Sequence, residues 1–231
     1  MKLRQTGVND AVLSTWIKKT PLLERLDISF TAVTGLAFLG SPCHVPRLEK
    51  LSVSGANLKN SDWVHAIDLL QLRTLNAGSM GLSRGSLTLN DTQLRMVTDL
   101  LEPLEHLESV SLVGNSNLSM TSSRGNGAIA EFIARVGWRC SVRRLRNYTL
   151  SLTSLQRLNL GNVSKLSSED LRGLLREEGE KSKIVSLTLS NTVVDDEAAV
   201  YLSTCPDLQA LAMENTKVTS KRASNTATGH I

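Results

Sequence analysis

The sequence predicts an α/β solenoid, a horseshoe with a parallel sheet on its concave side and helices on its convex side. Two observations predict this fold. A hexad of the form L-x-x-L-x-L, or an aliphatic variant of it, recurs seven times, and the apolar spacing between hexads changes from period two to that of a helix. The hexads occupy residues 23–28, 48–53, 72–77, 107–112, 155–160, 184–189 and 208–213.

The spacing of the hexads predicts the domain organisation. Successive hexads start 25, 24, 35, 48, 29 and 24 residues apart. Strand-and-return repeats of this type run to about 20–29 residues, so the spacing of 35 predicts an insertion and that of 48 an insertion or a degenerate repeat. We expect one domain over residues 1–218 with about eight or nine repeats, irregular at 119–152. Residues 219–231 lack core residues and are expected to form a disordered tail.

A second motif follows the hexad. Thr-x-Val begins three residues after the hexad at Thr31, Thr192 and Thr216, and Asn115 takes the same place in the fourth unit. A buried Thr or Asn there is expected to hydrogen-bond the turning backbone, whose donors would otherwise be unpaired. Thr6 begins the same motif 25 residues before Thr31. We therefore expect Leu3 to hold the last hexad position and the chain to begin inside a strand.

Helical spacing follows most of these turns. The predicted helices cover the apolar residues of 12–17, 64–70, 94–101, 128–138, 171–175 and 199–202. Four begin after a capping residue or pair: Asn9-Asp10, Ser61, Asn90-Asp91 and Asp195. Ser167 and Asp170 have the spacing of a capping box. Each helix is expected to turn its apolar stripe toward the strands.

The composition agrees with an aliphatic repeat and limits the possible functions. Hydrophobic residues make up 41% of the chain but aromatic ones only 3%. The net charge of +4 is small and the charges are interspersed, which argues against a dedicated nucleic-acid binder. No run of about eighteen apolar residues predicts a membrane span, and the N-terminus does not resemble a secretory signal. These features predict an intracellular, cytoplasmic protein.

The hexads and turns resemble those of leucine-rich-repeat proteins. The similar subtypes are the ribonuclease-inhibitor-like repeats and the cysteine-containing repeats attached to F-box proteins. Residues 195–211 carry the most specific match, an acidic-capped helix, the Cys205-Pro206 return and a new strand. The resemblance implies a noncatalytic scaffold that binds a protein of unknown identity. It leaves as the alternative the substrate-recognition arm of a ubiquitin-ligase complex, although no F-box is evident, and as a weaker one a GTPase regulator.

No residue pattern predicts catalysis, a metal site or a cofactor. Cys43, Cys140 and Cys205 fall in non-adjacent repeats, on the order of 10 Å apart or more for strands stacked at about 4.8 Å, which is beyond disulfide reach. The histidines have no ligand spacing, and no nucleophile motif or phosphate-binding loop occurs. We expect buried structural thiols, no catalytic or metal-binding residues and no small-molecule substrate.

The candidate binding residues come from the alternation of side chains along a strand. Hexad positions that flank the second leucine should face outward on the concave side, as should those just after the third leucine. Phe30 is the sharpest candidate, because an outward aromatic beside charges is typical of an interface anchor. Arg143, Arg144 and Arg146 form a second candidate, either a solvated loop or a docking site for an acidic partner. The concave-face candidates are Arg25, Asp27, Phe30, Lys50, Asn76, Arg157, Asn159 and Glu214; the alternative for each is a solvated sheet face.

Overall fold

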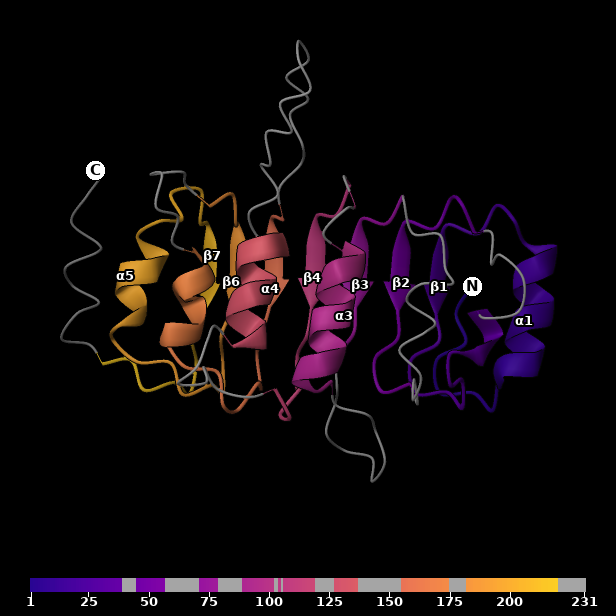
Figure 1. Cartoon of the computed structure of the whole chain (residues 1–231), viewed down its shortest axis with the longest axis horizontal. Helices are drawn as coiled ribbons and strands as arrows, with labels where there is room; N and C mark the ends of the chain where they lie inside the picture. Colours follow the sequence, from indigo (N-terminus) through magenta and orange to yellow (C-terminus); the bar gives the residue numbers. More distant parts are fainter. Residues whose placement is uncertain are drawn as a thin grey trace, which may run out of the picture.

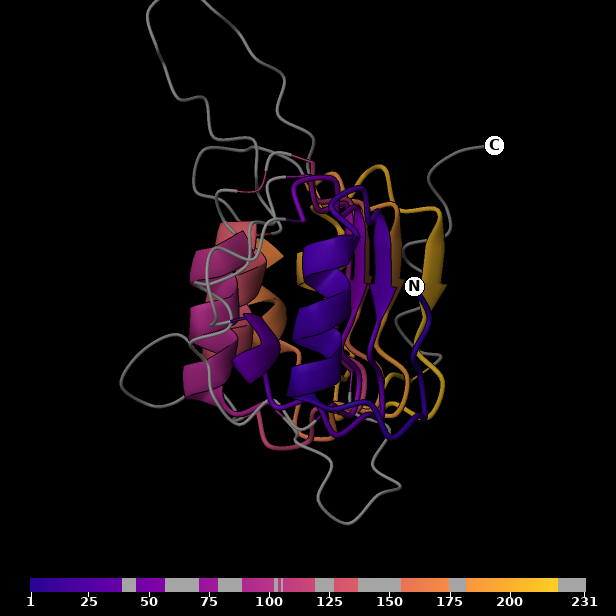
Figure 2. The same ribbon diagram turned by 90° about the vertical axis from the view of Figure 1, so that its right-hand side faces the viewer.

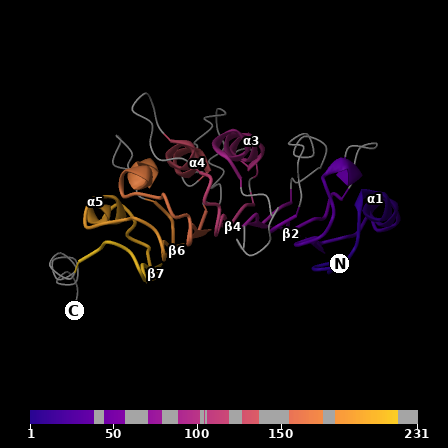
Figure 3. The same cartoon turned by 90° about the horizontal axis from the view of Figure 1, so that it is seen from below.

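The computed structural model describes residues 1–38, 45–56, 71–78, 89–101, 104, 106–118, 127–136, 155–174 and 182–219. Within these ranges the chain forms a row of parallel strands backed by helices (Figure 1). The row curves into an open arc, with the strands on its inner side and the helices on its outer side (Figure 3). The predicted α/β solenoid with a concave parallel sheet is therefore confirmed.

Seven strands of three residues each form the described sheet, in the order of the sequence. Every strand consists of the second leucine of a hexad, or its equivalent, and the residue on either side of it. The register aligns Leu26, Leu51, Leu75, Val110, Leu158, Leu187 and Leu211 in one row. The strands are β1 (Arg25–Asp27), β2 (Lys50–Ser52), β3 (Thr74–Asn76), β4 (Ser109–Ser111), β5 (Arg157–Asn159), β6 (Ser186–Thr188) and β7 (Ala210–Ala212).

The first residues of the chain continue this sheet. Lys2 pairs in parallel with Asp27, and the amide of Leu3 donates to the carbonyl of Asp27 at 2.8 Å. The amide of Asp27 in turn donates to the carbonyl of Met1 at 3.0 Å. Since Lys2 aligns with the third residue of β1, Leu3 holds the last hexad position, as the Thr6 motif predicts.

The convex layer is less regular than the sheet. Its described elements are α1 (Asp10–Lys19), η1 (Leu36–Phe38), α3 (Asp91–Leu101), α4 (Ala128–Val136), η2 (Glu169–Leu174) and α5 (Ala198–Leu202). All of them lie on the same side of the strands (Figure 2). The helix predicted at 171–175 is a 3-10 helix rather than an α-helix. The one predicted at 64–70 lies outside the described residues, as does the part of 119–152 other than 127–136.

Side-chain caps begin two of these helices as predicted. The Asn9 side chain accepts from the amide of Val12 at 3.2 Å, before α1. Asn90 and Gln93 exchange side-chain-to-backbone hydrogen bonds of 2.9 and 3.1 Å, before α3. Each pair satisfies amide groups that have no carbonyl partner in the first turn. Ser167 and Asp170 also bond each other, but the turn that follows them is the 3-10 helix η2.

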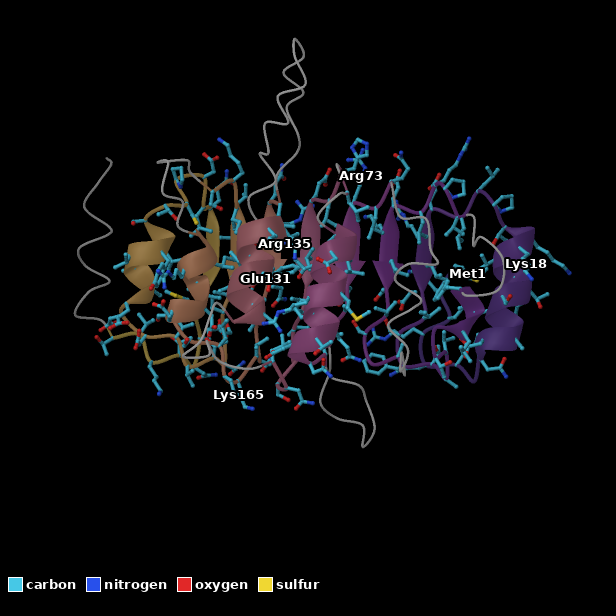
Figure 4. The ribbon with its side chains drawn as sticks, viewed as in Figure 1. Met1, Lys18, Arg73, Glu131, Arg135 and Lys165 are labelled. Carbon is cyan, nitrogen blue, oxygen red and sulfur yellow. The ribbon has the colours of Figure 1, made fainter. Side chains whose placement is uncertain are left out.

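Charged pairs connect α3 to α4. The Arg95 side chain lies 3.0 Å from Glu131, and the Arg135 guanidinium lies 2.7 Å from Asp99 and 3.0 Å from Glu131. Glu131 and Arg135 come from one face of α4, one turn apart (Figure 4). These side chains are partly exposed, so each pair contributes only about 0–1 kcal/mol.

The core lies between the sheet and the convex layer. The aligned hexad leucines are almost entirely buried, except in β7, where the side chain of Leu211 is 40% exposed. The composition predicts an aliphatic core, but Phe38 and Phe132 are among its largest fully buried side chains. They project from η1 and α4 into the core.

After β1, β4, β6 and β7 the residue three positions beyond the hexad is buried or half-buried in the turn, whereas Thr6 is exposed. The Thr31 hydroxyl donates to the carbonyl of Ile28 at 2.7 Å, and Thr192 donates in the same way to Leu189. Asn115 does both, since it donates to Leu112 at 2.7 Å and Ala77 at 3.1 Å and accepts from the Leu89 amide at 2.8 Å. The expected hydrogen bonds to the turning backbone therefore form. At Thr31 and Thr192 they go to carbonyl acceptors. Thr216 and Asn115 also accept from backbone amides, those of Val218 at 3.5 Å and of Leu89.

Candidate protein-binding face

The concave face is formed by the outer two residues of each strand and by the turn that follows. In β1, β2 and β5 the first residue is exposed, the middle leucine is buried and the third residue is half-buried. The predicted candidates Arg25, Lys50 and Arg157 hold the first position, and Asp27, Asn76 and Asn159 hold the third. The structure therefore brings these candidates to one face, in two parallel rows.

The third-position candidates also stabilise the turns. The side chain of Asp27 accepts from the amide of Ser29 at 3.0 Å, Asn76 from Gly78 at 3.3 Å and Asn159 from Gly161 at 3.0 Å. Asp and Asn commonly hydrogen-bond the backbone two residues on in this way. The signal was present in the sequence, because each of the three precedes a small residue by two positions.

Arg157 has an acidic neighbour that the concave-face candidates do not include. Glu108 lies just before β4, 2.6 Å from Arg73 and 3.5 Å from Arg157. The Arg157 side chain is still 53% exposed, so this pair is weak in water. Residues 108 and 157 are far apart in the sequence, and only the sheet register brings them together.

Phe30 holds a backbone conformation that bulky residues avoid. Its φ of 56° is left-handed, and the equivalent turn positions have the same sign of φ. Those positions hold Gln5, Gly55, Gly114, Asn162, Asn191 and Asn215. Glycine and asparagine tolerate this region, whereas a bulky side chain there costs about 1–3 kcal/mol.

The Phe30 ring is not isolated on the surface. A Cβ atom added at Gly55 would lie 2.5 Å from Cε1 of Phe30, so the ring covers the turn after β2. The Arg4 guanidinium lies 5.3 Å from the ring centroid, within cation–π distance. Phe30 is half-buried as a result.

The C-terminal half of the face carries smaller and less charged side chains. Its outer strand positions hold Ser186, Thr188, Ala210 and Ala212. Glu214, the last candidate, lies exposed after β7, and its amide donates to the Ser190 hydroxyl at 3.2 Å. The candidates Arg143, Arg144 and Arg146 lie outside the described residues.

Cys205 and Tyr201 are engaged in the fold. Burial raises the pKa of the Cys205 thiol, and hydrogen bonds with Ser182 and Thr204 only partly offset this. A hydrogen bond to Glu169 raises the pKa of Tyr201 to about 12. Among the described residues, no cluster of three or more His, Cys, Asp or Glu could hold a metal ion. None of the described helices has the length and apolarity that a membrane crossing requires.

Comparisons with known proteins support the fold but assign the chain to no family. No protein-family model matches the chain, and no curated protein does. A chain of the complex of Rad7 and Elc1 in yeast is similar in structure, with a TM-score of 0.54, at 16% identity. That match covers 95% of this chain and 46% of the Rad7–Elc1 chain, so this chain spans less than half of its length. An internalin from Listeria monocytogenes matches with a TM-score of 0.38 at 14% identity, over 93% of this chain and 68% of the internalin.

The class of protein follows from the fold. Parallel strands in sequence order, a hexad in one register and helices on the opposite side define a leucine-rich-repeat solenoid.

Proposed function

We propose that this chain is a noncatalytic scaffold that binds a partner protein on its concave face. One observation carries the proposal: seven strands align the same outward positions in two rows, in a single register. Solenoids of this type present an extended concave surface that suits a protein partner rather than a small molecule. The Rad7–Elc1 match, to a chain in a complex of two proteins, supports the same class of function.

The noncatalytic part of the proposal rests on what the titratable groups do. The Asp10 carboxylate receives hydrogen bonds from Thr34 and Ala37, and Asp170 receives two from Ser167. Cys205 is buried and Tyr201 bonds Glu169. Groups held in caps and turns are poorly placed to act as bases or nucleophiles. We therefore propose no catalytic residue, no cofactor and no nucleic acid, membrane or small molecule as ligand.

The subtype is part of the proposal. We propose ribonuclease-inhibitor-like or cysteine-containing repeats, supported by the buried thiol of Cys205 in the return from α5 to β7. A free thiol also supports the proposed intracellular, cytoplasmic location, since reducing compartments keep thiols reduced. The alternative function, substrate recognition within a ubiquitin-ligase complex, is the one that the cysteine-containing subtype would favour.

Photocrosslinking from defined positions tests the proposed face. A photoreactive amino acid replaces Ser186 or Thr188 on the concave side in one set of full-length variants, and the exposed Lys18 of α1 in the control. We expect a partner protein to crosslink to the concave positions and not to Lys18. Crosslinking from Lys18 alone would overturn the concave-face proposal.

A double substitution provides the independent test. We expect Phe30→Ala with Arg157→Ala to abolish capture of that partner. Circular dichroism must show that the variant stays folded, since Phe30 covers Gly55 and Arg157 lies beside Glu108. Unchanged capture by the folded variant would contradict the proposal.

A further inference from the structure

Four cations gather at the N-terminal end of the concave face. Arg25 and Lys50 are direct register partners in β1 and β2, and both are exposed. Neighbouring strands lie about 4.8 Å apart, and like charges directly opposite each other destabilise a sheet. Lys2 and Arg4 extend the group onto the segment that pairs with β1. We call Lys2, Arg4, Arg25, Lys50 and Phe30 the N-terminal patch.

These cations lack the ion pairs that two arginines farther along the sheet have. In the described part of the chain, Lys2, Arg4, Arg25 and Lys50 make no salt bridge, whereas Arg73 and Arg157 both lie within 4 Å of Glu108. An anionic ligand can relieve the repulsion between the aligned Arg25 and Lys50.

The acids near the patch narrow the class of ligand. Asp27 is the register partner of Lys2, and its carboxylate accepts a hydrogen bond from the amide of Ser29. Glu24 and Glu49 precede the first residues of β1 and β2, so they lie at the strand entrances beside Arg25 and Lys50. A continuous phosphate backbone would meet these two carboxylates, whereas a peptide with spaced acids can avoid them. The arrangement therefore favours an acidic protein segment over a nucleic acid.

Phe30 adds an apolar element to the patch. It holds an aromatic ring at a left-handed position where the equivalent described turns hold glycine, asparagine or, at residue 5, glutamine. The ring rests over Gly55, and Arg4 lies 5.3 Å from its centroid. An aromatic ring beside a guanidinium can receive an apolar side chain and an acid from the same segment.

We propose that the N-terminal patch binds an acidic, extended segment of the partner protein, with an apolar side chain of that segment against Phe30. The proposal rests on the proposed function, since it names the chemistry of the partner on the same concave face. Charge complementarity selects this occupant, and the strained aromatic gives it a fixed anchor point.

Peptide selection tests the chemistry directly. Random short peptides are selected on the immobilised full chain, and the selected peptides are then measured by fluorescence anisotropy. We expect selected peptides to be acidic and to carry a large apolar residue. Enrichment of neutral or basic peptides, or equal binding of a single-stranded DNA oligonucleotide, would overturn the proposal.

Charge reversal locates the binding. We expect Arg25→Glu with Lys50→Glu to weaken peptide binding by roughly tenfold or more. The matched control is Lys165→Glu with Lys217→Glu, which makes the same change of net charge away from the strands; Lys165 lies at the opposite edge of the solenoid from Arg73 (Figure 4). An equal loss in the control would mean that only long-range charge matters and would overturn the assigned site.

Phe30→Asn separates the anchor from a purely structural ring. Asparagine holds the equivalent position at 162, 191 and 215, so the fold tolerates it. We expect unchanged or higher thermal stability together with roughly tenfold weaker peptide binding. Binding equal to that of the unchanged chain would overturn the role of Phe30.

The crosslinked native partner distinguishes the two levels of proposal. If the partner crosslinks from Ser186 but binds the Arg25→Glu, Lys50→Glu chain at full strength, the patch is wrong and the scaffold stands. If no concave position crosslinks to any protein, both proposals fail.

Discussion

The concave sheet of this solenoid is regular from repeat to repeat, whereas the convex layer varies in the length and type of its helices. Hexads that start between 24 and 48 residues apart still place their strands in one unbroken register. Among the described residues, the convex side contains α-helices from five to eleven residues long and two 3-10 helices. Backbone pairing requires the same geometry in every repeat, whereas helices that pack through side chains can accommodate differences in length. The difference shows that the sheet determines the shape of the solenoid, while differences in repeat length are accommodated on the convex side.

Of the changes considered, removing an aligned leucine from the sheet should lower the free energy of unfolding most. Leu158 of β5 is 2% exposed and packs in the core row. We expect Leu158→Ala to lower the free energy of unfolding by about 3 kcal/mol, because the cavity cannot close without disturbing both neighbouring strands. Val200→Ala, at a 57% exposed position on α5, should change it by less than about 0.5 kcal/mol. Urea unfolding followed by circular dichroism measures both, and equal losses would contradict the contrast.

Substitutions in the turns that join the two layers should have the next largest effect on the free energy of unfolding. Asn115 is fully buried and makes hydrogen bonds to Ala77, Leu112 and Leu89. We expect Asn115→Ala to cost about 2–3 kcal/mol, since it leaves buried backbone groups unpaired. Thr192→Val loses one such bond, from Thr192 to Leu189, and should cost about 1 kcal/mol. If the threonine variant proves the more destabilising in urea unfolding, the assigned roles of the two turns are wrong.

A smaller, pH-dependent effect should arise on the convex side. Burial would raise the pKa of Asp10, but hydrogen bonds from Ala37 and Thr34 outweigh it and hold the pKa below the usual 3.8. A carboxyl group whose pKa is depressed by folding stabilises the protein above its unfolded pKa, and this stabilisation is lost as the pH falls through the folded pKa.

The Asp10→Ala variant tests this linkage. We expect it to cost about 1 kcal/mol near neutral pH and progressively less below pH 3.8. Thermal melts across that range check it. A difference between the two chains that grows on acidification would have the wrong sign.

The smallest expected effect concerns the strained turn. We expect Phe30→Asn to leave the free energy of unfolding unchanged or to raise it by up to about 1 kcal/mol, as relief of left-handed strain offsets the lost contact with Gly55. The reverse change, Asn162→Phe, should cost about 1–2 kcal/mol. If the Phe30→Asn chain melts well below the parent, the ring is chiefly a structural cover.

Part of the candidate face could be predicted from the sequence. Alternation in the hexad identified Arg25, Lys50 and Arg157 as outward residues, and the rule needs no knowledge of neighbours. It did not reveal that Glu108 lies beside Arg157, because that contact depends on which strands are adjacent. Nor did it reveal that Phe30 packs on Gly55, because the left-handed turn directs the ring toward the next repeat. The binding roles of all these residues stay predictions.

The sequence by itself determined the repeat, its register and the inward row of leucines. A period-two apolar pattern admits one orientation of each strand, because a slip of one residue would expose every leucine. Tertiary structure alone decided the 3-10 form of η2, the inward placement of Phe38 and Phe132, and the partners of Glu108 and Asn115. Those features depend on the spacing and packing between repeats, which no local pattern encodes.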